Sequence, residues 1–201
     1  KEELSHYALD TWDIEYMFPF GWKEVQGLSN RTDFDLKKHM EFSKKDLSIF
    51  DEETKKKILP HVICEPSQGV ERAFLVFMFD AYHYDKSREN IVLKLHPNFA
   101  PVKVGIFPLV SNKPEIMKKA KEIYDELKKE FTCAFDTSGS IGRRYSRQDE
   151  IGTPVCVTID FQTLEDSTVT LRDRDTTEQI RISIADLKKS IGEFLRGEKN
   201  Q

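Results

Sequence analysis

The chain has 201 residues, of which 38% are hydrophobic and 33% are charged, and its formal net charge is −4. This is the composition of a soluble globular protein with enough apolar residues for a core. Residues 1–100 carry 14 basic and 18 acidic side chains, a net charge of −4, whereas residues 101–201 carry 17 of each. This charge distribution excludes a protein that binds nucleic acid through an overall positive charge, and any contact with nucleic acid must be local.

Cysteine usage and hydropathy exclude several further classes. The three cysteines, Cys64, Cys133 and Cys156, lie far apart without a C-x-x-C pair, so neither structural zinc nor a disulfide framework is expected. A reducing, cytoplasmic setting is the simplest interpretation. No apolar run approaches the ~20 residues of a membrane span, so no membrane partner is expected. The chain opens on "KEELSH" without Met or a signal peptide, which is typical of the middle of a longer protein.

The first half predicts strands around one central helix. "GWKEVQGLSNRTDFDL" (21–36) predicts a strand followed by a polar loop, and "HVIC" (61–64) predicts a strand that ends at Glu65. "GVERAFLVFMFDAY" (69–82) is apolar on every side and predicts a buried helix. Three of its aromatic residues are expected in the core: Phe74, Phe77 and Phe79. These elements predict an α+β domain built on an antiparallel sheet.

"EPSQGVER" (65–72) places polar side chains at the junction of two elements expected to be buried. Gly69 lets the backbone approach a ligand, and the free N–H groups of a helix start suit an anion. Arg72 suits a phosphate or a purine ring, and Glu65 suits an ammonium group. An amino acid activated on ATP supplies both charges. The alternative is an internal ion pair of Arg72 with Glu65 or Glu71.

The second half is regular and predicts the order β-α-β-α-β-β-β-α. Pro114 stands near the start of the first helix, Gly152 closes the second, and Ser183 caps the last. The elements are expected over 102–110, 112–131, 133–136, 138–152, 154–160, 168–184 and after Ser183. The order predicts a compact α/β domain whose mixed sheet is parallel at first and ends in a hairpin. Near residue 100 the sequence changes from irregular, aromatic segments to a regular pattern of strands and helices, so we predict domains over 1–98 and 99–201.

Several motifs together resemble the glycyl-tRNA synthetases. "EPSQGVER" is similar to motif 3 of class II aminoacyl-tRNA synthetases, and "GWKEVQGLSNRTDFDL" to a segment upstream of it in this family. "SGSIGRRYSRQDEIGTPVCVTIDF" and "TLRDRDTTEQ" are similar to the anticodon-binding domain of the family. The resemblance runs from about residue 6 to about residue 195. It implies part of an antiparallel-sheet catalytic domain followed by an α/β anticodon-binding domain.

The resemblance also implies the chemistry and the site residues. Glycine, ATP with Mg²⁺, and glycine-specific tRNA are the implied substrates and partners. The implied glycine contacts are Glu24, Glu65, Ser67 and Gly69. The implied ATP contacts are Glu24, Val25, Gly69, Val70, Glu71 and Arg72. Asp33 and Asp35 could face the ligand, but a loop cap or a pair with Arg31 explains them equally well.

For tRNA, the resemblance points to arginines of the second half. The candidates for the anticodon are Arg143, Arg144, Arg147, Arg172 and Arg174. Structural pairing with Asp149, Glu150 or Asp160 is an alternative for the first three. In a strand, Arg172 and Arg174 share one face, which could be an arginine face for RNA.

Two motifs of the family do not occur in these 201 residues: motif 1, which builds a homodimer, and motif 2, whose arginine holds the α-phosphate. The resemblance therefore implies a C-terminal fragment. Two other interpretations stay open. One is a synthetase-like nucleic-acid-binding subunit, such as the accessory subunit of mitochondrial DNA polymerase, and the other is a free-standing anticodon-domain protein. The joint presence of Glu24, Glu65, Ser67 and Arg72 favours the synthetase.

Overall fold

The structure is a computed structural model that describes residues 6–197. The chain falls into two compact units, Lys1–Val76 and Phe77–Gln201. The division lies inside helix α2 (Val70–Ala81), upstream of the change in composition near residue 100. None of the helices among residues 6–197 has the length and apolar character that crossing a bilayer requires.

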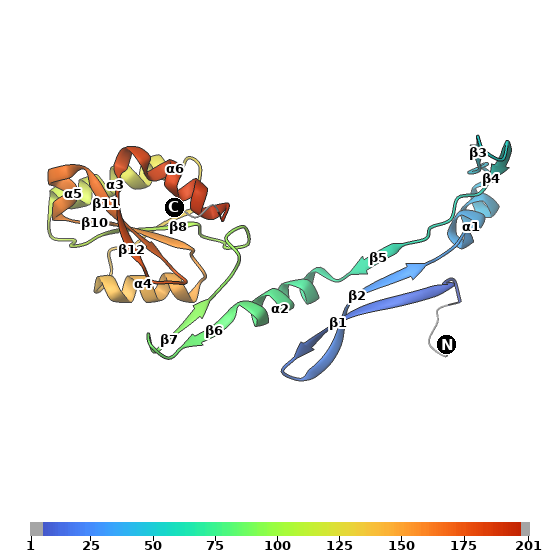
Figure 1. The fold of residues 1–201 in the computed structure, drawn as a ribbon, viewed down its shortest axis with the longest axis horizontal. Coiled ribbons are helices and arrows are strands. Elements are labelled where there is room, and N and C mark those ends of the chain that lie inside the picture. Colours follow the sequence, from blue (N-terminus) through green and yellow to red (C-terminus); the bar gives the residue numbers. More distant parts are fainter. Residues whose placement is uncertain (1–5, 198–201) are drawn as a thin grey trace. The chain divides into compact units, whose positions relative to one another are not determined.

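The first unit is built on a three-stranded antiparallel sheet in the order β1-β2-β5 (Figure 1). Its strands are β1 (Asp10–Phe18), β2 (Gly21–Asn30) and β5 (Glu65–Gln68). The connection from β2 to β5 contains α1 (Phe34–Ser43), β3 (Ile49–Asp51) and β4 (Lys56–Ile58). The antiparallel sheet confirms the fold class predicted for this half. The polar loop expected after β2 is short, since only residues 31–33 lie between β2 and α1.

The strand expected over residues 61–64 is wrong. There, Val62 forms one isolated bridge with Thr32, and the strand begins only at Glu65. Strand β5 is an edge of the sheet, where Pro66 is tolerated because one side of the strand needs no ladder hydrogen bonds. The polar stretch of "EPSQ" is therefore itself a strand, and its side chains alternate between two faces.

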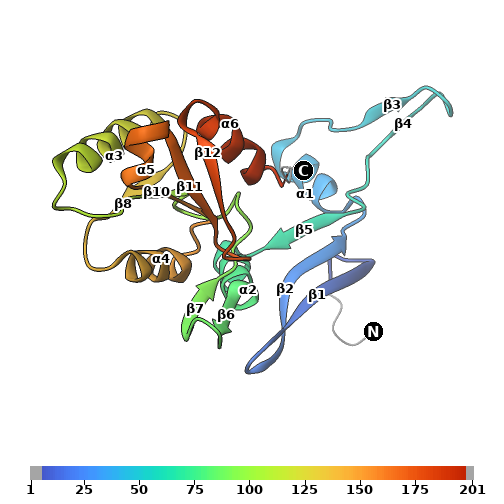
Figure 2. The same ribbon diagram turned by 60° about the vertical axis from the view of Figure 1, so that its left-hand side comes forward.

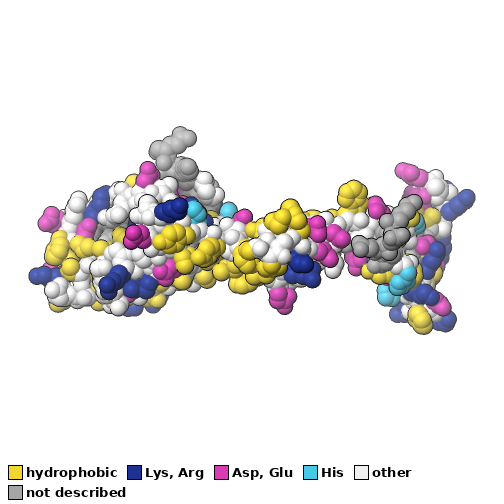
Figure 3. Space-filling view, turned by 90° about the horizontal axis from the view of Figure 1, so that it is seen from below, with side chains coloured by type: hydrophobic (Ala, Val, Ile, Leu, Met, Phe, Trp, Pro, Cys, Tyr) yellow, Lys and Arg dark blue, Asp and Glu magenta, His cyan; other side chains and the backbone are white. Residues whose placement is uncertain are grey.

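Helix α2 is largely exposed, so the prediction of a buried helix is wrong for the described residues. Its one buried residue is Ala81, and Phe74 is 64% exposed. The other two phenylalanines assigned to the core, Phe77 and Phe79, are also exposed. Figure 3 shows hydrophobic side chains gathered at the surface there. A helix that is apolar on all sides is buried only where other elements cover it. In the described chain, such cover comes from Leu93 and Leu95, near Ala81.

The second unit carries a five-stranded mixed sheet in the order β12-β11-β10-β8-β9. Its strands are β8 (Val104–Pro108), β9 (Cys133–Phe135), β10 (Val155–Ile159), β11 (Thr168–Asp173) and β12 (Gln179–Ser183). Strands β9, β8 and β10 are parallel, and β10, β11 and β12 are antiparallel. This confirms the predicted mixed sheet with its terminal hairpin. A separate hairpin of β6 (Tyr82–Asp85) and β7 (Asn90–Leu93) precedes the sheet.

Helices cover both faces of this sheet. They are α3 (Pro114–Leu127), α4 (Ile141–Glu150), α5 (Phe161–Asp166) and α6 (Ile184–Leu195). Figures 1 and 2 show α4 on one face and α3, α5 and α6 on the other. Helix α5 is an addition to the predicted order, since its six residues are too few for a periodic signal.

Local signals set the helix starts as expected. Pro114 is the first residue of α3, where its missing N–H is not needed. The Ser140 hydroxyl accepts from the backbone N–H of Arg143 at the start of α4, and the Ser183 hydroxyl accepts from that of Ala185 at the start of α6.

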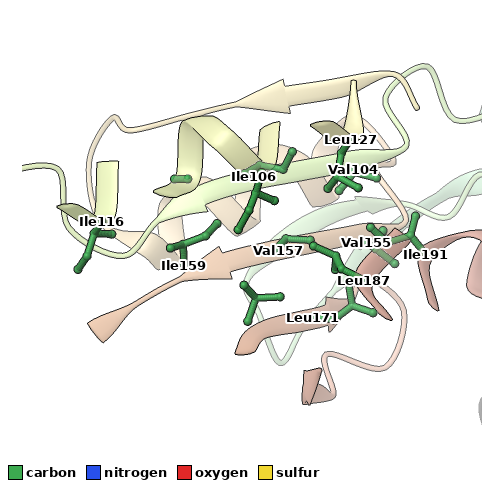
Figure 4. Packing of buried hydrophobic residues seen from close by; sticks show 13 residues of the cluster. Val104, Ile106, Ile116, Leu127, Val155, Val157, Ile159, Leu171, Leu187 and Ile191 are labelled. Carbon is green, nitrogen blue, oxygen red and sulfur yellow. The ribbon is translucent and has the colours of Figure 1, made fainter. Parts of the chain in front are cut away.

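Branched aliphatic residues of the central strands form the core of the second unit (Figure 4). Ile106 of β8 and Val157 of β10 are fully buried. Ile116 and Leu127 of α3 and Ile191 of α6 contribute from one side of the sheet. Burying each such side chain stabilises the fold by roughly 1.5–3 kcal/mol. A continuous apolar run is typical of a parallel strand covered on both faces.

Gly105, in the middle of β8, tests how tightly this unit is packed. An added Cβ there would lie 2.8 Å from Phe107 Cζ and 3.1 Å from Cys156 Sγ. Gly105→Ala is therefore expected to lower the free energy of unfolding by about 1–3 kcal/mol. Gly142→Ala is the control, because a Cβ there has nothing within 4 Å. It should be neutral or slightly stabilising. Urea denaturation of both variants measures this, and equal stability would contradict the packing.

Candidate functional site

Strand register places two implied glycine contacts on one face of the first sheet. Ser67 pairs with Gly27, and Glu65 pairs with Ser29. Directly opposed residues share a face, and residues two apart in a strand share a face. Glu65 and Ser67 therefore project from the same side of β5, where Ser67 is exposed and Glu65 partly exposed.

A β-bulge brings Glu24 to this same side. The register of β1 and β2 shifts between Ile14 and Glu15, which leaves Val25 as the extra, buried residue of β2. A Cβ built on Gly27 would lie 3.7 Å from Glu24 Oε1 and 3.5 Å from Asp13 Oδ1. The missing side chain of Gly27 thus leaves room in front of both carboxylates. Without the bulge, the alternation of side chains along β2 would place Glu24 on the face opposite Gly27. The extra residue, Val25, brings Glu24 to the same face as Gly27.

Asp13 is a carboxylate that the sequence did not single out. It pairs with Gly27 in the register of β1 and β2. This position depends on the pairing of two strands, so no local sequence signal points to it. Glu15 is a second such carboxylate, because it opposes Glu24. The face therefore gathers four carboxylates and three hydroxyls: Asp13, Glu15, Glu24 and Glu65 with Thr11, Ser29 and Ser67.

Arg31 organises the rim of this face. Its Nε and Nη2 donate to the Asp35 carboxylate at 2.5 and 2.8 Å, and its Nη1 donates to Glu65 Oε2 at 2.9 Å. Its guanidinium carbon lies 4.0 Å from the centre of the Tyr7 ring. The hydrogen bond with Arg31 holds the pKa of Asp35 below its usual range, and the same pair raises the pKa of Arg31. Of the alternatives for Asp35, the pair with Arg31 is the one that forms.

Asp33 has different partners. It occupies the N-cap position of α1, although its side chain makes no capping hydrogen bond. Its carboxylate lies 2.8 Å from Lys37 Nζ, and that hydrogen bond lowers the pKa of Asp33. Asp33 therefore serves the start of α1 in this structure.

Arg72 connects the start of α2 with β2. Its Nη1 donates to the backbone carbonyl of Glu24 at 2.9 Å. Neither Glu65 nor Glu71 forms an ion pair with Arg72 among the described residues, so the internal pair considered from the sequence does not occur there. Gly69, with Val70, Glu71 and Arg72, is exposed at the helix start. The arrangement leaves a guanidinium and free helical N–H groups beside the acidic face, which suits an anion next to an ammonium group.

Two of the five candidate RNA-contacting arginines are accessible in the second unit. Arg143 is exposed in the first turn of α4. Arg147 lies one turn later, with 43% of its side chain exposed, and its Nε donates to Asp136 Oδ2 at 3.0 Å. Residues four apart share a helix face, so these two side chains form one small basic surface.

Arg144 points the other way and is buried. Its Nη1 donates to the Pro108 carbonyl, and its Nη2 donates to the Gly139 carbonyl at 2.8 Å. Burial lowers the pKa of Arg144, and its Nε has no hydrogen-bond partner among the described residues. Arg144 thereby ties α4 to the carboxyl end of β8.

Arg172 and Arg174 are also buried. Arg172 forms a bidentate ion pair with Asp149, at 2.8 and 3.0 Å, and lies 4.6 Å from the centre of the Tyr145 ring. Arg174 Nη1 donates to the Gly152 carbonyl at 2.8 Å, and its Nε and Nη2 bond the Asp175 carboxylate. The two arginines do share a side, as the alternation predicted, but that side is covered by α4 and the loop after it. A direct RNA contact by either one stays a prediction.

No group of three or more His, Cys, Asp or Glu side chains within residues 6–197 is arranged to hold a metal ion.

The chain is similar to known proteins in two respects. Residues 103–194 match a family described as an anticodon binding domain. The chain is also similar to proteins named glycine–tRNA ligase. It is 53% identical to that of Caldanaerobacter subterraneus subsp. tengcongensis over 198 residues, which cover 98% of this chain and 42% of the relative.

Two other relatives with this name show the same pattern. Identity to the protein of Acetivibrio thermocellus is 52% over 190 residues, covering 93% of this chain and 40% of the relative. Identity to that of Corynebacterium efficiens is 50% over 207 residues, covering 98% and 44%. The chain therefore spans about two fifths of the length of the curated relatives it matches.

Removing Arg31 tests the rim of the acidic face. Because the hydrogen bond with Arg31 is the main reason for the low pKa of Asp35, Arg31→Met is expected to raise that pKa toward its ordinary value. A depressed folded-state pKa means that Asp35 stabilises the fold above its unfolded pKa. This stabilisation is lost as the pH falls through the folded pKa, and the variant should lack it.

Carboxyl ¹³C NMR titration measures both pKa values in one sample. Lys37→Met is the matched control, since it should raise the pKa of Asp33 and leave that of Asp35 unchanged. An unchanged Asp35 pKa in Arg31→Met would show that this ion pair does not form in solution.

Proposed function

We propose that this chain, whose sequence matches the C-terminal part of glycyl-tRNA synthetase, supplies one wall of the glycine and ATP site and the anticodon-binding domain of a glycine–tRNA ligase. The observation that carries the proposal is the shared face of Glu24, Glu65 and Ser67, with Arg72 bonded to Glu24 beside it. The relatives named glycine–tRNA ligase support it over nearly the whole chain. They do not favour a polymerase accessory subunit or a free-standing anticodon-domain protein.

The acidic face suits the amino group of glycine. Two carboxylates and a hydroxyl can accept the three hydrogens of an ammonium group, and carboxylates close to it favour its charged form. Arg31 orients Glu65 by a charge-assisted hydrogen bond. A side chain larger than that of glycine would compete for the space in front of Gly27.

Arg72 and the start of α2 suit ATP. In the proposed first step, a carboxylate oxygen of glycine attacks the α-phosphorus of ATP, and the bond to the β-phosphate oxygen breaks. Pyrophosphate leaves, and Mg²⁺ that enters with ATP would neutralise the phosphate charge. The glycyl group then passes to a hydroxyl of the 3′-terminal adenosine of tRNA, and AMP is released.

These steps depend mainly on positioning and on charge stabilisation. The α-phosphate clamp of motif 2 and the dimer interface of motif 1 would come from other parts of the full-length enzyme, a homodimer. We propose the cytoplasm as the location of this reaction.

Glu65→Ala in the full-length ligase tests the glycine site. Losing a hydrogen bond to a charged group costs about 1.5–3 kcal/mol, so the apparent KM for glycine should rise roughly 10- to 150-fold. ATP–pyrophosphate exchange at varied glycine concentration measures this. Glu52→Ala is the control, because its side chain is 79% exposed in the first unit, paired with Lys55 away from this face. Normal glycine saturation in Glu65→Ala would refute the proposed site.

For the second unit, we propose that Arg143 and Arg147 contact the anticodon of a glycine-specific tRNA. Unstacked bases are recognised by hydrogen bonds to their edges and by stacking on planar groups, and a guanidinium does both. Residues 101–201 are neutral overall, so affinity must come from few arginines on one surface.

Fluorescence anisotropy with an anticodon stem-loop tests this surface. Arg143→Ala should weaken binding by about 1–3 kcal/mol, and so should replacing one of the two cytosines that glycine anticodons share. Lys118→Ala is the control, because it removes the same charge from an exposed position of α3, on the other face of the sheet. Equal losses in Arg143→Ala and Lys118→Ala would show that Arg143 contributes charge alone.

A further inference from the structure

The β6–β7 hairpin lies outside residues 103–194, which match the anticodon-binding family, yet it packs along α4 within the second unit. Figures 1 and 2 show β7 next to α4 from two directions. Its turn carries Arg88, whose side chain is only 15% exposed. A guanidinium this far buried needs partners for its N–H groups.

Arg88 finds partners on three elements. Its Nε lies 3.0 Å from Asp85 Oδ2 within the hairpin. Its Nη1 donates to Asp149 Oδ2 of α4 at 3.1 Å and to the Arg174 carbonyl at 2.7 Å. Its Nη2 donates to the Asp175 carbonyl at 2.9 Å. All three guanidinium nitrogens are thus bonded, and one side chain links the hairpin, α4 and the segment after β11.

The Asp149 carboxylate is shared. It is 2% exposed and bonds Arg172 through both oxygens while Oδ2 also accepts from Arg88. The cluster contains three guanidinium groups and three carboxylates, so its charge balances: Arg88, Arg172 and Arg174 with Asp85, Asp149 and Asp175. Removing one member of such a buried cluster leaves an uncompensated charge, which is strongly destabilising.

Two other contacts hold the hairpin close. Asn90 Nδ2 donates to the Ser146 carbonyl at 3.2 Å. Gly152, after α4, has a φ of +81°, and a Cβ there would lie 2.9 Å from the Leu93 carbonyl oxygen. Both the left-handed conformation and the close backbone approach require glycine. The hairpin therefore meets α4 in its middle, at its last turn and just beyond.

These contacts fix the rotation of α4. Successive helical residues are turned by about 100° around the axis, so Ser146 lies roughly opposite Arg144 and Gln148, and Asp149 lies between these two sides. The buried Arg144 and Gln148 face the sheet, Asp149 bonds both Arg172 of the sheet and Arg88 of the hairpin, and the hairpin also holds the Ser146 carbonyl. The remaining, exposed side carries Arg143 and Arg147, of which Arg147 also bonds Asp136.

We propose that Arg88 is a positioning residue for RNA recognition: by clamping the β6–β7 hairpin to Asp149, it sets the orientation in which α4 presents Arg143 and Arg147. The functional anticodon-binding unit accordingly includes the hairpin and begins near residue 77. The role in recognition rests on the proposed tRNA function, whereas the clamp itself does not.

Arg88→Met in the full 201-residue chain is the test, with Lys86→Met as its matched control. Lys86 lies in the same turn and carries the same charge, but it is exposed. Hydrogen exchange should show faster exchange of the amides of residues 82–93 and 147–152 in Arg88→Met, on the order of tenfold or more, and no change in Lys86→Met. Unchanged exchange in Arg88→Met would overturn the clamp.

The second readout is discrimination, measured by anisotropy as the ratio of affinities for the matched and the cytosine-replaced stem-loop. It is taken at a temperature where both variants are folded, so that stability alone does not move it. Arg88→Met should reduce the ratio about threefold or more, because a misplaced edge contact loses part of the discrimination of roughly 1–3 kcal/mol per base. Lys86→Met should keep the ratio.

Arg88→Lys keeps the charge in case Arg88→Met does not fold. A single ammonium group cannot bond three elements in the geometry of a planar guanidinium, so intermediate exchange and an intermediate ratio are expected. A loosened hairpin with full discrimination would overturn the positioning role. If the unmodified chain binds no stem-loop, the proposed tRNA function fails, and the exchange data still decide whether the clamp exists.

Discussion

The second unit depends on one buried carboxylate. Asp149 lies between Arg88 and Arg172, two guanidinium groups from segments far apart in the unit's sequence. Each of the three charges is costly to remove from water, and each is tolerated only because the others are present. A cluster of this kind adds less stability than a well-packed apolar core would, but it accepts only one arrangement of its members. The cluster therefore fixes the positions of the hairpin, α4 and the end of β11 relative to one another.

Different physical devices build the two candidate surfaces. On the first sheet, backbone register does the work: pairing of β2 with β5 and one bulge at Val25 collect carboxylates from three strands on one face. On α4, side-chain contacts determine the surface. Buried partners hold two sides of the helix, so that Arg143 and Arg147 lie on its third, exposed side. A sheet face is fixed by ladder hydrogen bonds and needs few side chains for its geometry. A single exposed helix has no such ladder to its neighbours and is oriented by its contacts.

The sequence was informative where signals are local. Apolar strand runs, Pro114 and Ser183 predicted the mixed sheet and the starts of α3 and α6, because periodicity and capping act within a few residues. It failed where partners are distant. The apolar "HVIC" is not a strand, because ladder pairing with β2 selects the polar "EPSQ" instead. Asp13 joins the acidic face only through strand register. Arg172 and Arg174 resembled an RNA surface because the sequence does not show that α4 and the loop after it cover them.

The arginine-rich motifs acquire a different meaning from this. "SIGRRY" and "RDRD" together contain four arginines, and three of them, Arg144, Arg172 and Arg174, are buried in structural contacts. A motif dense in arginine is thus mostly a scaffold here, and its exposed part is small. In a domain without net charge, general attraction to phosphate contributes little, so recognition has to rest on the placement of the few groups that remain exposed. Placement in turn requires rigid support. This explains why many of the charged side chains form buried structural contacts and only a few are exposed.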